Sequence, residues 1–294
     1  MTDRFNLLII NPKAGKGNAG RLASVFEKYL KEHNFDYRII RTEYPGHAAE
    51  IVKENLFRKN LFIYSIGGDG TLNEVVNGAV FSEAAVISIP SGSGNDFIRS
   101  ITELNDPYDI FMKSFSSQVS RIDTLKVNER YCINIASAGF DAVVAHNMNH
   151  FKQMPFVSGS AAYILGIFKT LINFSFHNFS ITIDSKKQTG EYLLAAAANG
   201  KYYGGGIKAA PDAKVDDGFL DICIVSRLNK IRIPGLISKY KKGLHEGLKE
   251  VQLLKGKKVI IESDKIIQIN IDGEIVESDT TVIELIPASL NIIT

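Results

Sequence analysis

The first half of the chain alternates short apolar runs with amphipathic helical patterns, and this alternation constrains the fold more than any other feature. The runs lie at residues 7–10, 37–40, 61–66 and 85–89. They have the length and composition of buried strands. Between them, Leu22, Phe26 and Leu30, and later Leu72 and Val76, recur at helical spacing. Strands that alternate with helices predict a doubly wound, mostly parallel α/β sheet, in which ligands bind at the carboxyl ends of the strands.

Composition excludes several classes of protein. The 294 residues are 45% hydrophobic and 22% charged, which is typical of a globular chain with room for two domains. A net charge of +2 gives no general attraction for nucleic acid, so we expect no nucleic-acid partner. Cys132 and Cys223 lie far apart and match no zinc or disulfide pattern, which favours a cytoplasmic location. We identify no signal peptide, and no apolar run reaches the roughly 18 residues of a membrane span.

The loop after the first apolar run has the sequence NPKAGKGNAGR at residues 11–21. It contains a G-x-G-x-x-G match, but four residues separate the strand from the first glycine, unlike a dinucleotide fingerprint. It also lacks the Lys-Ser/Thr pair of a Walker A motif. Glycines that expose backbone N–H groups, together with Lys13 and Lys16, nevertheless favour a phosphate site over a simple turn.

Two further glycine-rich loops follow later strands. GGDGTLNEVVNG at residues 67–78 places three glycines around Asp69 and runs directly into a helical pattern. PSGSGNDF at residues 90–97 adds the hydroxyls of Ser91 and Ser93 and the carboxylate of Asp96. Glycines, a helix N-terminus and a carboxylate that binds Mg²⁺ suit a polyphosphate. Three such loops at neighbouring strand ends predict a nucleotide-binding crevice.

From about residue 126 the pattern changes to strand after strand. The expected strands lie at residues 131–135, 179–183, 192–198, 219–225, 259–262, 266–271 and 282–286. Two helices are expected, at residues 161–174 and at residues 237–248, the second rich in lysine. We therefore predict a nucleotide-binding α/β domain at 1–125, completed by 282–294, and a mainly antiparallel, β-sandwich-like domain at 126–281.

Two acidic segments of the second half allow both a structural and a functional interpretation. The segment PDAKVDDGFLD at residues 211–221 does not have EF-hand spacing, and its spacing alone favours an Asp-Gly turn. Asp272-Gly273-Glu274 also reads as a turn between strands. Phosphoryl transfer to an alcohol, however, benefits from a carboxylate that accepts the hydroxyl proton.

The loop sequences resemble those of the diacylglycerol kinase catalytic family, especially its bacterial lipid kinases. The matching elements are N-P-x-x-G at 11–15, G-G-D-G-T-x-N-E-V at 67–75 and G-x-x-N-D-F-x-R at 92–99. GGDGT also occurs in NAD kinases and 6-phosphofructokinases, whereas its continuation and the first element are more specific to lipid kinases. The resemblance, together with the loops, gives these nucleotide-binding residues: Asn11, Pro12, Lys13, Ala14, Gly15, Thr42, Gly67, Gly68, Asp69, Gly70, Thr71, Leu72, Asn73, Ser93 and Asp96.

The resemblance also implies residue roles in the second half. Glu274 matches the residue that accepts the proton, with Asp272 as its orienting partner or the alternative base, and Asp69 completes the catalytic set. The D-D-G-x-L-D segment matches a structural Mg²⁺ site made by Asp217 with the carbonyls of Lys214 and Phe219. Asp123 matches a residue that supports the metal and water network.

The resulting interpretation is a lipid kinase that uses ATP and Mg²⁺ and phosphorylates a lipid hydroxyl, foremost that of diacylglycerol, to give phosphatidic acid. It would work in the cytoplasm, peripherally at the inner membrane surface, and a homodimer is left open. The alternatives are an NAD kinase-like phosphotransferase and a catalytically silent nucleotide- or lipid-binding protein. The carboxylates of Asp69, Asp96 and Glu274 argue against loss of catalysis.

Overall fold

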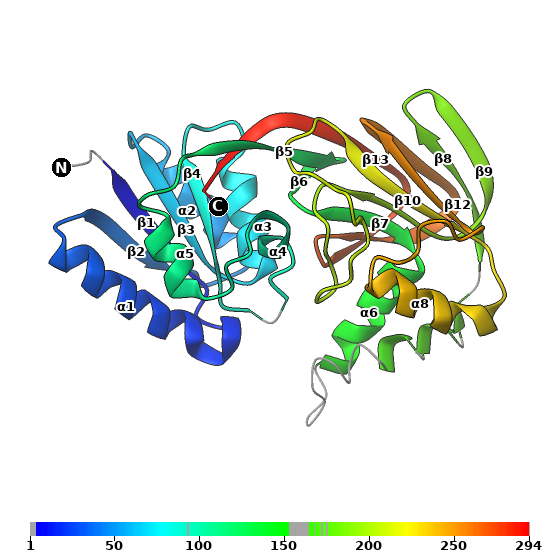
Figure 1. The fold of residues 1–294 in the computed structure, drawn as a ribbon, viewed down its shortest axis with the longest axis horizontal. Helices are drawn as coiled ribbons and strands as arrows, with labels where there is room; N and C mark the ends of the chain where they lie inside the picture. The colour runs from blue at the N-terminus through cyan, green and yellow to red at the C-terminus, as the bar shows by residue number, and fades with distance from the viewer. Residues whose placement is uncertain are drawn as a thin grey trace.

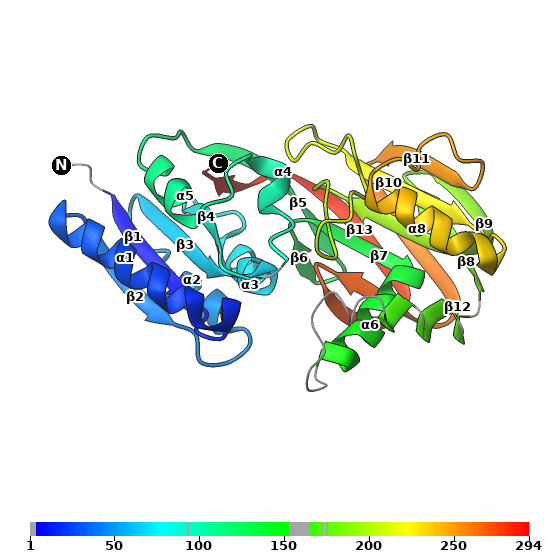
Figure 2. The same cartoon turned by 60° about the horizontal axis from the view of Figure 1, so that its bottom comes forward.

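The computed structural model describes residues 4–92, 94–152, 165–167, 169–171, 173–174 and 176–293. Ser93 and residues 161–164, 168 and 172 of the helix expected at 161–174 therefore lie outside the described residues, whereas 165–167, 169–171 and 173 are helical. In the described part, no helix combines the length and the apolar character needed to cross a membrane. The molecule has two halves, which Figures 1 and 2 show side by side.

The first half is built on a parallel sheet with the strand order β4-β3-β1-β2. Its strands are β1 (Phe5–Ile10), β2 (Asp36–Arg41), β3 (Leu61–Gly67) and β4 (Ala85–Pro90). The helical elements are η1 (Ala14–Gly17), α1 (Asn18–Glu32), α2 (His47–Asn55), α3 (Asp69–Ala79), α4 (Ile98–Ile101) and α5 (Pro107–Lys113). This confirms the predicted α/β architecture.

Alternation of side chains along β1 explains why helices cover both faces of this sheet. Leu7 and Ile9 share one buried cluster with residues of α2 and α3. Leu8 and Ile10 point the other way and share a cluster with residues of α1 and α5. Both faces of the strand are thus apolar, as expected for a strand buried between two helical layers.

The second half is mainly antiparallel. Its strands are β5 (Ser120–Val127), β6 (Arg130–Cys132), β7 (Ile135–Gly139), β8 (His177–Ile183), β9 (Lys186–Ala198), β10 (Leu220–Ser226), β11 (Val251–Gly256), β12 (Lys258–Ile271) and β13 (Glu274–Ile292). The helical elements are α6 (Phe140–Lys152), η2 (Lys230–Arg232) and α8 (Ile233–Lys241). The path β11-β10-β9-β7-β12-β13 continues into β4 of the first half.

Two apolar clusters organise this second half. One is enclosed between strands and contains Ala136 of β7, Ile181 of β8 and Ile261 of β12. The other lies where α6 and α8 pack on the opposite face of β7, β9 and β10, through residues such as Val144 and Leu236. Figure 2 shows both helices on this same side of the sheet. The β-rich, sandwich-like class predicted for this half is confirmed.

The strand β13 joins the two halves. Its first part pairs with β12 from Glu274 to Glu284, and its later part pairs with β5 up to Ile292. Asn291 and Ile292 then pair in parallel with Ala85 and Val86 of β4. Figure 1 shows β13 running from one half into the other. The domain boundaries themselves stay a prediction, but the end of the chain does lie in the first sheet.

Three predicted elements of the second half differ from the structure. The strand expected at 131–135 is wrong, because β6 ends at Cys132 and β7 begins at Ile135. The helix expected at 237–248 instead runs from Ile233 to Lys241, and Gly243 and Gly247 take positive φ beyond its end. The strands expected at 259–262 and 266–271 form one strand, β12, with an irregular register between Glu262 and Ile267.

Candidate active site

A cavity of about 150 Å³ lies at the carboxyl ends of β1 and β2, beside the start of α3. It is lined by Asn11, Lys13, Thr42, Glu43, Tyr44, Pro45, Thr71 and Glu74. Four of these residues, Asn11, Lys13, Thr42 and Thr71, are predicted nucleotide-binding residues from three different loops. The structure therefore brings them together, as expected for ligands at the carboxyl ends of parallel strands.

Close backbone contacts hold the glycine loops against one another. The Nδ2 atom of Asn11 donates a 3.1 Å hydrogen bond to Oγ1 of Thr71, which links the first loop to α3. Gly15 has φ +59°, and a Cβ atom there would lie 1.9 Å from the carbonyl oxygen of Ser91. Only glycine permits this approach. The hydroxyl of Ser91 is buried and has no hydrogen-bond partner among the described residues, so it is a further donor on this rim.

Asp69 fixes the loop that follows β4. Its Oδ2 accepts a 2.7 Å hydrogen bond from the N–H of Asn95, and its Oδ1 accepts a 2.8 Å bond from the N–H of Asp96. A Cβ atom on Gly94 would lie 2.4 Å from Oδ2 of Asp69, so this glycine lets the carboxylate approach the loop. Asp69 is thus a link between two loops as well as a candidate metal ligand.

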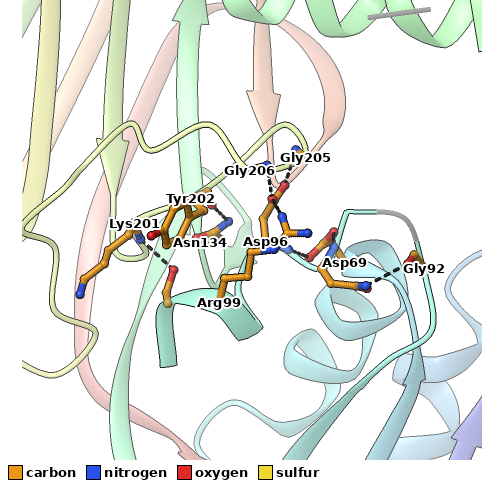
Figure 3. Close-up of polar contacts among 11 residues, drawn as sticks. Asp69, Gly92, Asp96, Arg99, Asn134, Lys201, Tyr202, Gly205 and Gly206 are labelled. Atoms are coloured by element: carbon orange, nitrogen blue, oxygen red, sulfur yellow. Dashed lines mark hydrogen bonds and ion pairs between the residues drawn. The ribbon is translucent and has the colours of Figure 1, made fainter. Parts of the chain in front are cut away.

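Asp96 connects the first half to a glycine-rich loop of the second half. Its carboxylate accepts hydrogen bonds of 2.8 and 2.7 Å from the N–H groups of Gly205 and Gly206, and Arg99 forms an ion pair with it at 3.0 Å. Figure 3 shows these contacts beside Asp69. Burial raises the pKa of Asp96, and the nearby Asp69 carboxylate adds to this effect. Asp96 thus links the two halves, and its predicted contact with a nucleotide stays a prediction.

A second pair of contacts lies next to Asp96. The hydroxyl of Ser100 accepts a 2.9 Å hydrogen bond from the N–H of Lys201, and Asn134 donates a 2.6 Å bond from Nδ2 to the carbonyl of Tyr202. Sequence analysis did not identify this loop at residues 200–207. Its signal in the sequence is the triple glycine at 204–206, where all three residues take positive φ.

Asp272 lies at a junction between the two halves. Its carboxylate accepts hydrogen bonds from Nδ2 of Asn73 at 3.0 Å and from Sγ of Cys132 at 3.0 Å. It also accepts bonds from three consecutive N–H groups, those of residues 133–135, at 2.8–3.2 Å. These N–H groups turn towards Asp272 and away from a neighbouring strand, which is why the strand predicted at 131–135 is interrupted. Burial raises the pKa of Asp272, although the hydrogen bonds oppose this rise.

Glu274 has a more open environment than Asp272. Its side chain is 54% exposed, and one oxygen forms a 3.1 Å ion pair with Arg130. It lies two residues beyond Asp272, at the start of β13 and on the turn that contacts Asn73 of α3. Of the two carboxylates, Glu274 is therefore the one that an incoming substrate can reach.

The acidic turn at residues 211–221 contains Asp217, the predicted Mg²⁺ ligand. Its Oδ1 accepts a 3.1 Å hydrogen bond from the N–H of Phe219, and its Oδ2 lies 2.6 Å from Nζ of Lys255. Lys255 also lies 3.4 Å from Asp221. A carboxylate with backbone carbonyls such as that of Lys214 suits Mg²⁺ chemically, but Lys255 already neutralises this one. No cluster of three or more His, Cys, Asp or Glu side chains occurs in the described ranges, and the metal site stays a prediction.

Asp123 ties the acidic turn to the strand that joins the halves. The side chain is buried, and it accepts hydrogen bonds from the N–H of Gly218 at 2.9 Å and of Ala288 at 2.8 Å. Its own N–H donates to the carbonyl of Val215 at 2.7 Å. These contacts give Asp123 a structural role, and the role in a metal and water network that the resemblance implied stays a prediction.

The remaining predicted residues fall into different environments. Leu72 is 3% exposed and packs in the core, so any contact with a ligand would come from its backbone. Gly67 and Gly68 lie where β3 passes into α3, and Gly70 is in the exposed first turn.

Sequence reasoning did not identify Tyr44 and Glu74, which also line the cavity. Glu74 belongs to the G-G-D-G-T-x-N-E-V element, which was a signal for it, whereas no pattern distinguishes Tyr44 from a surface residue.

Family comparisons agree with this geometry. Residues 6–127 match the diacylglycerol kinase catalytic domain, and residues 134–294 match the YegS C-terminal NAD kinase beta sandwich-like domain. A protein of Staphylococcus saprophyticus named diacylglycerol kinase is 30% identical over 273 residues, which are 91% of this chain and 88% of that protein. A protein of Staphylococcus aureus strain Newman, named "Putative lipid kinase", is 27% identical over 251 residues, 84% of this chain and 82% of its own.

Solved structures give the same result. A crystal structure described as "a putative diacylglycerol kinase" from Bacillus anthracis strain Sterne superimposes with a TM-score of 0.81 and 25% identity, and covers 99% of this chain and 95% of that one. These matches show that the chain belongs to the diacylglycerol kinase catalytic family of lipid kinases. The resemblance found in the loop sequences is thus confirmed, together with the phosphotransferase class that it implied.

Proposed function

We propose that the protein transfers the γ-phosphoryl group of ATP to a lipid hydroxyl, and that its substrate is diacylglycerol and its product phosphatidic acid. The bond between the γ-phosphorus and the bridging oxygen of ATP breaks, and ADP leaves. A new bond forms between this phosphorus and the acceptor oxygen, whose proton passes to a carboxylate. The S. saprophyticus relative named diacylglycerol kinase supports this choice of substrate.

The contact between Asn73 and Asp272 is the observation that carries the proposal. It holds the turn with Asp272 and Glu274 against the first turns of α3, the helix that begins at Asp69. A candidate proton acceptor therefore lies beside the glycine loop that would hold the phosphates. Nucleotide binding alone does not need a reachable carboxylate in this position, whereas phosphoryl transfer to an alcohol does.

The nucleotide would occupy the cavity at the strand ends. Free N–H groups in the first turn of α3 and the positive end of its dipole would face the phosphates, with Lys13 as a neutralising charge. Asn11, Thr42 and Thr71 offer polar atoms along the same wall. Asn11 and Thr42 directly follow β1 and β2, and Thr71 lies in the first turn of α3, so elements of regular structure position this set.

Glu274 would accept the proton of the lipid hydroxyl as the new bond forms. Asp272 would act as a positioning residue, because five donors already occupy its carboxylate and hold the turn in place. Arg130 pairs with Glu274 and would hold its carboxylate in place before the substrate arrives.

The carboxylate of Asp69 is a suitable ligand for Mg²⁺. Each carboxylate oxygen accepts one N–H bond and keeps a second lone pair, so Asp69 could ligate a metal without releasing its loop. Bound Mg²⁺ would neutralise charge on the phosphate oxygens. The acidic turn around Asp217 is a separate candidate, with Lys214 and Phe219 as carbonyl donors, and it lies outside the nucleotide cavity.

The substrate also determines where the protein would act. A diacylglycerol resides in a membrane, so we propose a cytoplasmic protein that works peripherally at the inner membrane surface.

The test is a transfer assay with purified protein, radiolabelled ATP and Mg²⁺. Mixed micelles would present diacylglycerol, monoacylglycerol or a sphingoid base in separate reactions, and NAD would serve as a soluble acceptor. Label in phosphatidic acid is the expected result, and an Asp69→Asn variant is the matched inactive control. Label in NAD alone would assign the protein to the NAD kinase-like class, and binding of ATP without label in any acceptor would indicate a silent binding protein.

A further inference from the structure

Residues 230–250 form a basic stretch of the second half. They contain six Lys and Arg residues and only two carboxylates, Glu246 and Glu250. This excess of four positive charges is larger than the net charge of +2 of the whole chain. The rest of the protein is therefore slightly acidic overall, and positive charge is concentrated here.

Helix α8 presents this charge on one side. Ile233, Leu236 and Tyr240 are at most 8% exposed and pack into the cluster beneath the helix. Lys239, Lys241 and Lys242 are exposed, and helical spacing puts them on the side away from these buried residues. None of the three takes part in an ion pair among the described residues. Glu250 pairs instead with Arg232.

Large apolar side chains flank these lysines at both ends of the helix. Ile231, in η2 before α8, is 86% exposed, and Leu244, just after α8, is 64% exposed. These are among the most exposed large apolar residues of the described chain. We call the exposed side chains of Ile231, Lys239, Lys241, Lys242 and Leu244 the basic helix surface. It combines unpaired positive charge with apolar side chains that have nothing to bury them.

We propose that the basic helix surface docks on anionic phospholipid bilayers. The lysines attract the negative head groups, while the side chains of Ile231 and Leu244 insert between the head groups. Both effects would act at the surface of the membrane. Nucleic acid would also attract the lysines, but a phosphate backbone offers no apolar environment for the two exposed side chains. The surface therefore fits a membrane better than a polyanion.

The position of α8 in the fold agrees with this orientation. Figures 1 and 2 show α8 on the same side of the second half as α6, and both helices pack on one face of β7, β9 and β10. Docking through α8 would therefore also bring α6 towards the bilayer and leave the opposite face of the sheet in solution. This inference rests on the proposed function, because it names the surface through which a lipid kinase would meet its substrate.

The test is co-sedimentation of the full protein with vesicles that contain neither diacylglycerol nor nucleotide. Vesicles of phosphatidylcholine alone are compared with equimolar phosphatidylcholine and phosphatidylglycerol. The triple variant Lys239→Ala, Lys241→Ala, Lys242→Ala is expected to bind the anionic vesicles on the order of a hundredfold more weakly than the wild type. The matched control, Lys53→Ala, Lys59→Ala, Lys265→Ala, removes three exposed lysines elsewhere and is expected to bind as the wild type does.

A second variant separates insertion from charge. Ile231→Ser with Leu244→Ser is expected to weaken binding about tenfold while keeping its dependence on salt. Equal binding to both kinds of vesicle, no binding by the wild type, or equal losses in the triple variant and its control would overturn the proposal. So would lysine-dependent binding of duplex DNA in place of vesicles. Because the vesicles hold no acceptor lipid and no ATP is present, the result is independent of whether the proposed transfer reaction occurs.

Discussion

Asn73 and Asp272 lie 199 positions apart in the chain, and Nδ2 of Asn73 donates a 3.0 Å hydrogen bond to Oδ2 of Asp272. This bond joins the first turns of α3 to the turn at Asp272 and Glu274 in the second half. The same carboxylate orders the N–H groups of residues 133–135. One side chain therefore determines both the local path of the chain and the meeting of the two halves.

Replacement of Asp272 is expected to cost stability as well as activity. Asp272→Asn replaces one carboxylate oxygen, which accepts hydrogen bonds, with an NH₂ group, which cannot accept them. At least one of the N–H donors around this side chain would then have no acceptor. We expect the free energy of unfolding in urea to fall by about 2–3 kcal/mol. Asp279→Asn, at an exposed position of β13, is the control and is expected to change little. Equal stability of the two variants would contradict this role.

Glu274→Gln is expected to separate chemistry from folding. The amide keeps the shape of the side chain but cannot take up a proton, so kcat should fall by about 10²–10⁴-fold. Affinity for ATP and the melting temperature should stay near those of the wild type, because Glu274 is half exposed and its ion pair with Arg130 lies at the surface. Glu277→Gln on the same strand is the control. Full activity of Glu274→Gln would move the base to another residue.

Gly15 and Gly20 provide a matched pair for the first loop. Gly15→Ala would place a Cβ atom 1.9 Å from the carbonyl of Ser91 at a positive φ, whereas a Cβ on Gly20, within α1, would meet nothing within 4 Å. We expect Gly15→Ala to weaken ATP binding at least about tenfold. Gly20→Ala should bind ATP normally and gain up to about 1 kcal/mol of stability. Titration with a fluorescent ATP analogue measures the first effect, and similar affinities of both variants would argue against the assigned phosphate site.

The acidic turn allows a test of the predicted Mg²⁺ site. A metal that binds only the folded protein raises its melting temperature as its concentration increases. Lys255 competes for Asp217, so Lys255→Met is expected to strengthen this Mg²⁺ effect, and Asp217→Ala should abolish it. Thermal unfolding without nucleotide, over a series of Mg²⁺ concentrations, provides the measurement. If neither the wild type nor Lys255→Met responds, Lys255 alone neutralises the turn.

Asp141 is expected to make stability depend on pH. Burial raises the pKa of this carboxyl to about 6, with hydrogen bonds from Ser137 and the backbone opposing the rise, and its Oδ1 has no partner among the described residues. A raised pKa favours the protonated form in the folded state. The stabilisation is therefore complete below about pH 4 and is lost as the pH rises through about 6.

Asp141→Asn removes this dependence. Relative to the wild type, the free energy of unfolding of the variant is expected to rise by about 2–3 kcal/mol between about pH 4 and pH 8. Urea unfolding at both pH values measures the change. Asp264→Asn, an exposed control, should show no such shift. A constant difference between Asp141→Asn and the wild type would show that this carboxyl does not titrate in that range.

Local patterns explain which parts of the molecule could be predicted. The strands of the first half and the glycine loops depend on residues that are neighbours in the chain, such as the apolar run ending at Ile10 and the glycines around Asp69. The role of Asp96 depends on Gly205, 109 positions away, and that of Asp272 on Ile133, 139 positions away. No local pattern contains these partners, so the link between the halves through Asp96 was not predicted, and the strand at 131–135 was expected to be continuous.

The helix expected at 237–248 illustrates a different limit. Lysine and leucine are good helix formers, and their spacing extends past Lys241. Gly243 and Gly247 take positive φ there, and the N–H of Leu244 donates to the carbonyl of Lys239. These contacts are a local glycine C-cap, so the helix ends at a glycine signal that helical spacing alone does not take into account.

The pairing of Asn291 and Ile292 with β4 has a consequence for how the chain is made. During synthesis, β1 to β4 leave the ribosome long before their last neighbour does. The edge of β4 therefore stays unpaired until residues 291 and 292 have been made, with hydrogen-bonding groups exposed to pairing with another nascent chain. Folding of the first half thus depends on residues that are synthesised after the second half, and a chain without residues 291 and 292 would leave β4 without this partner.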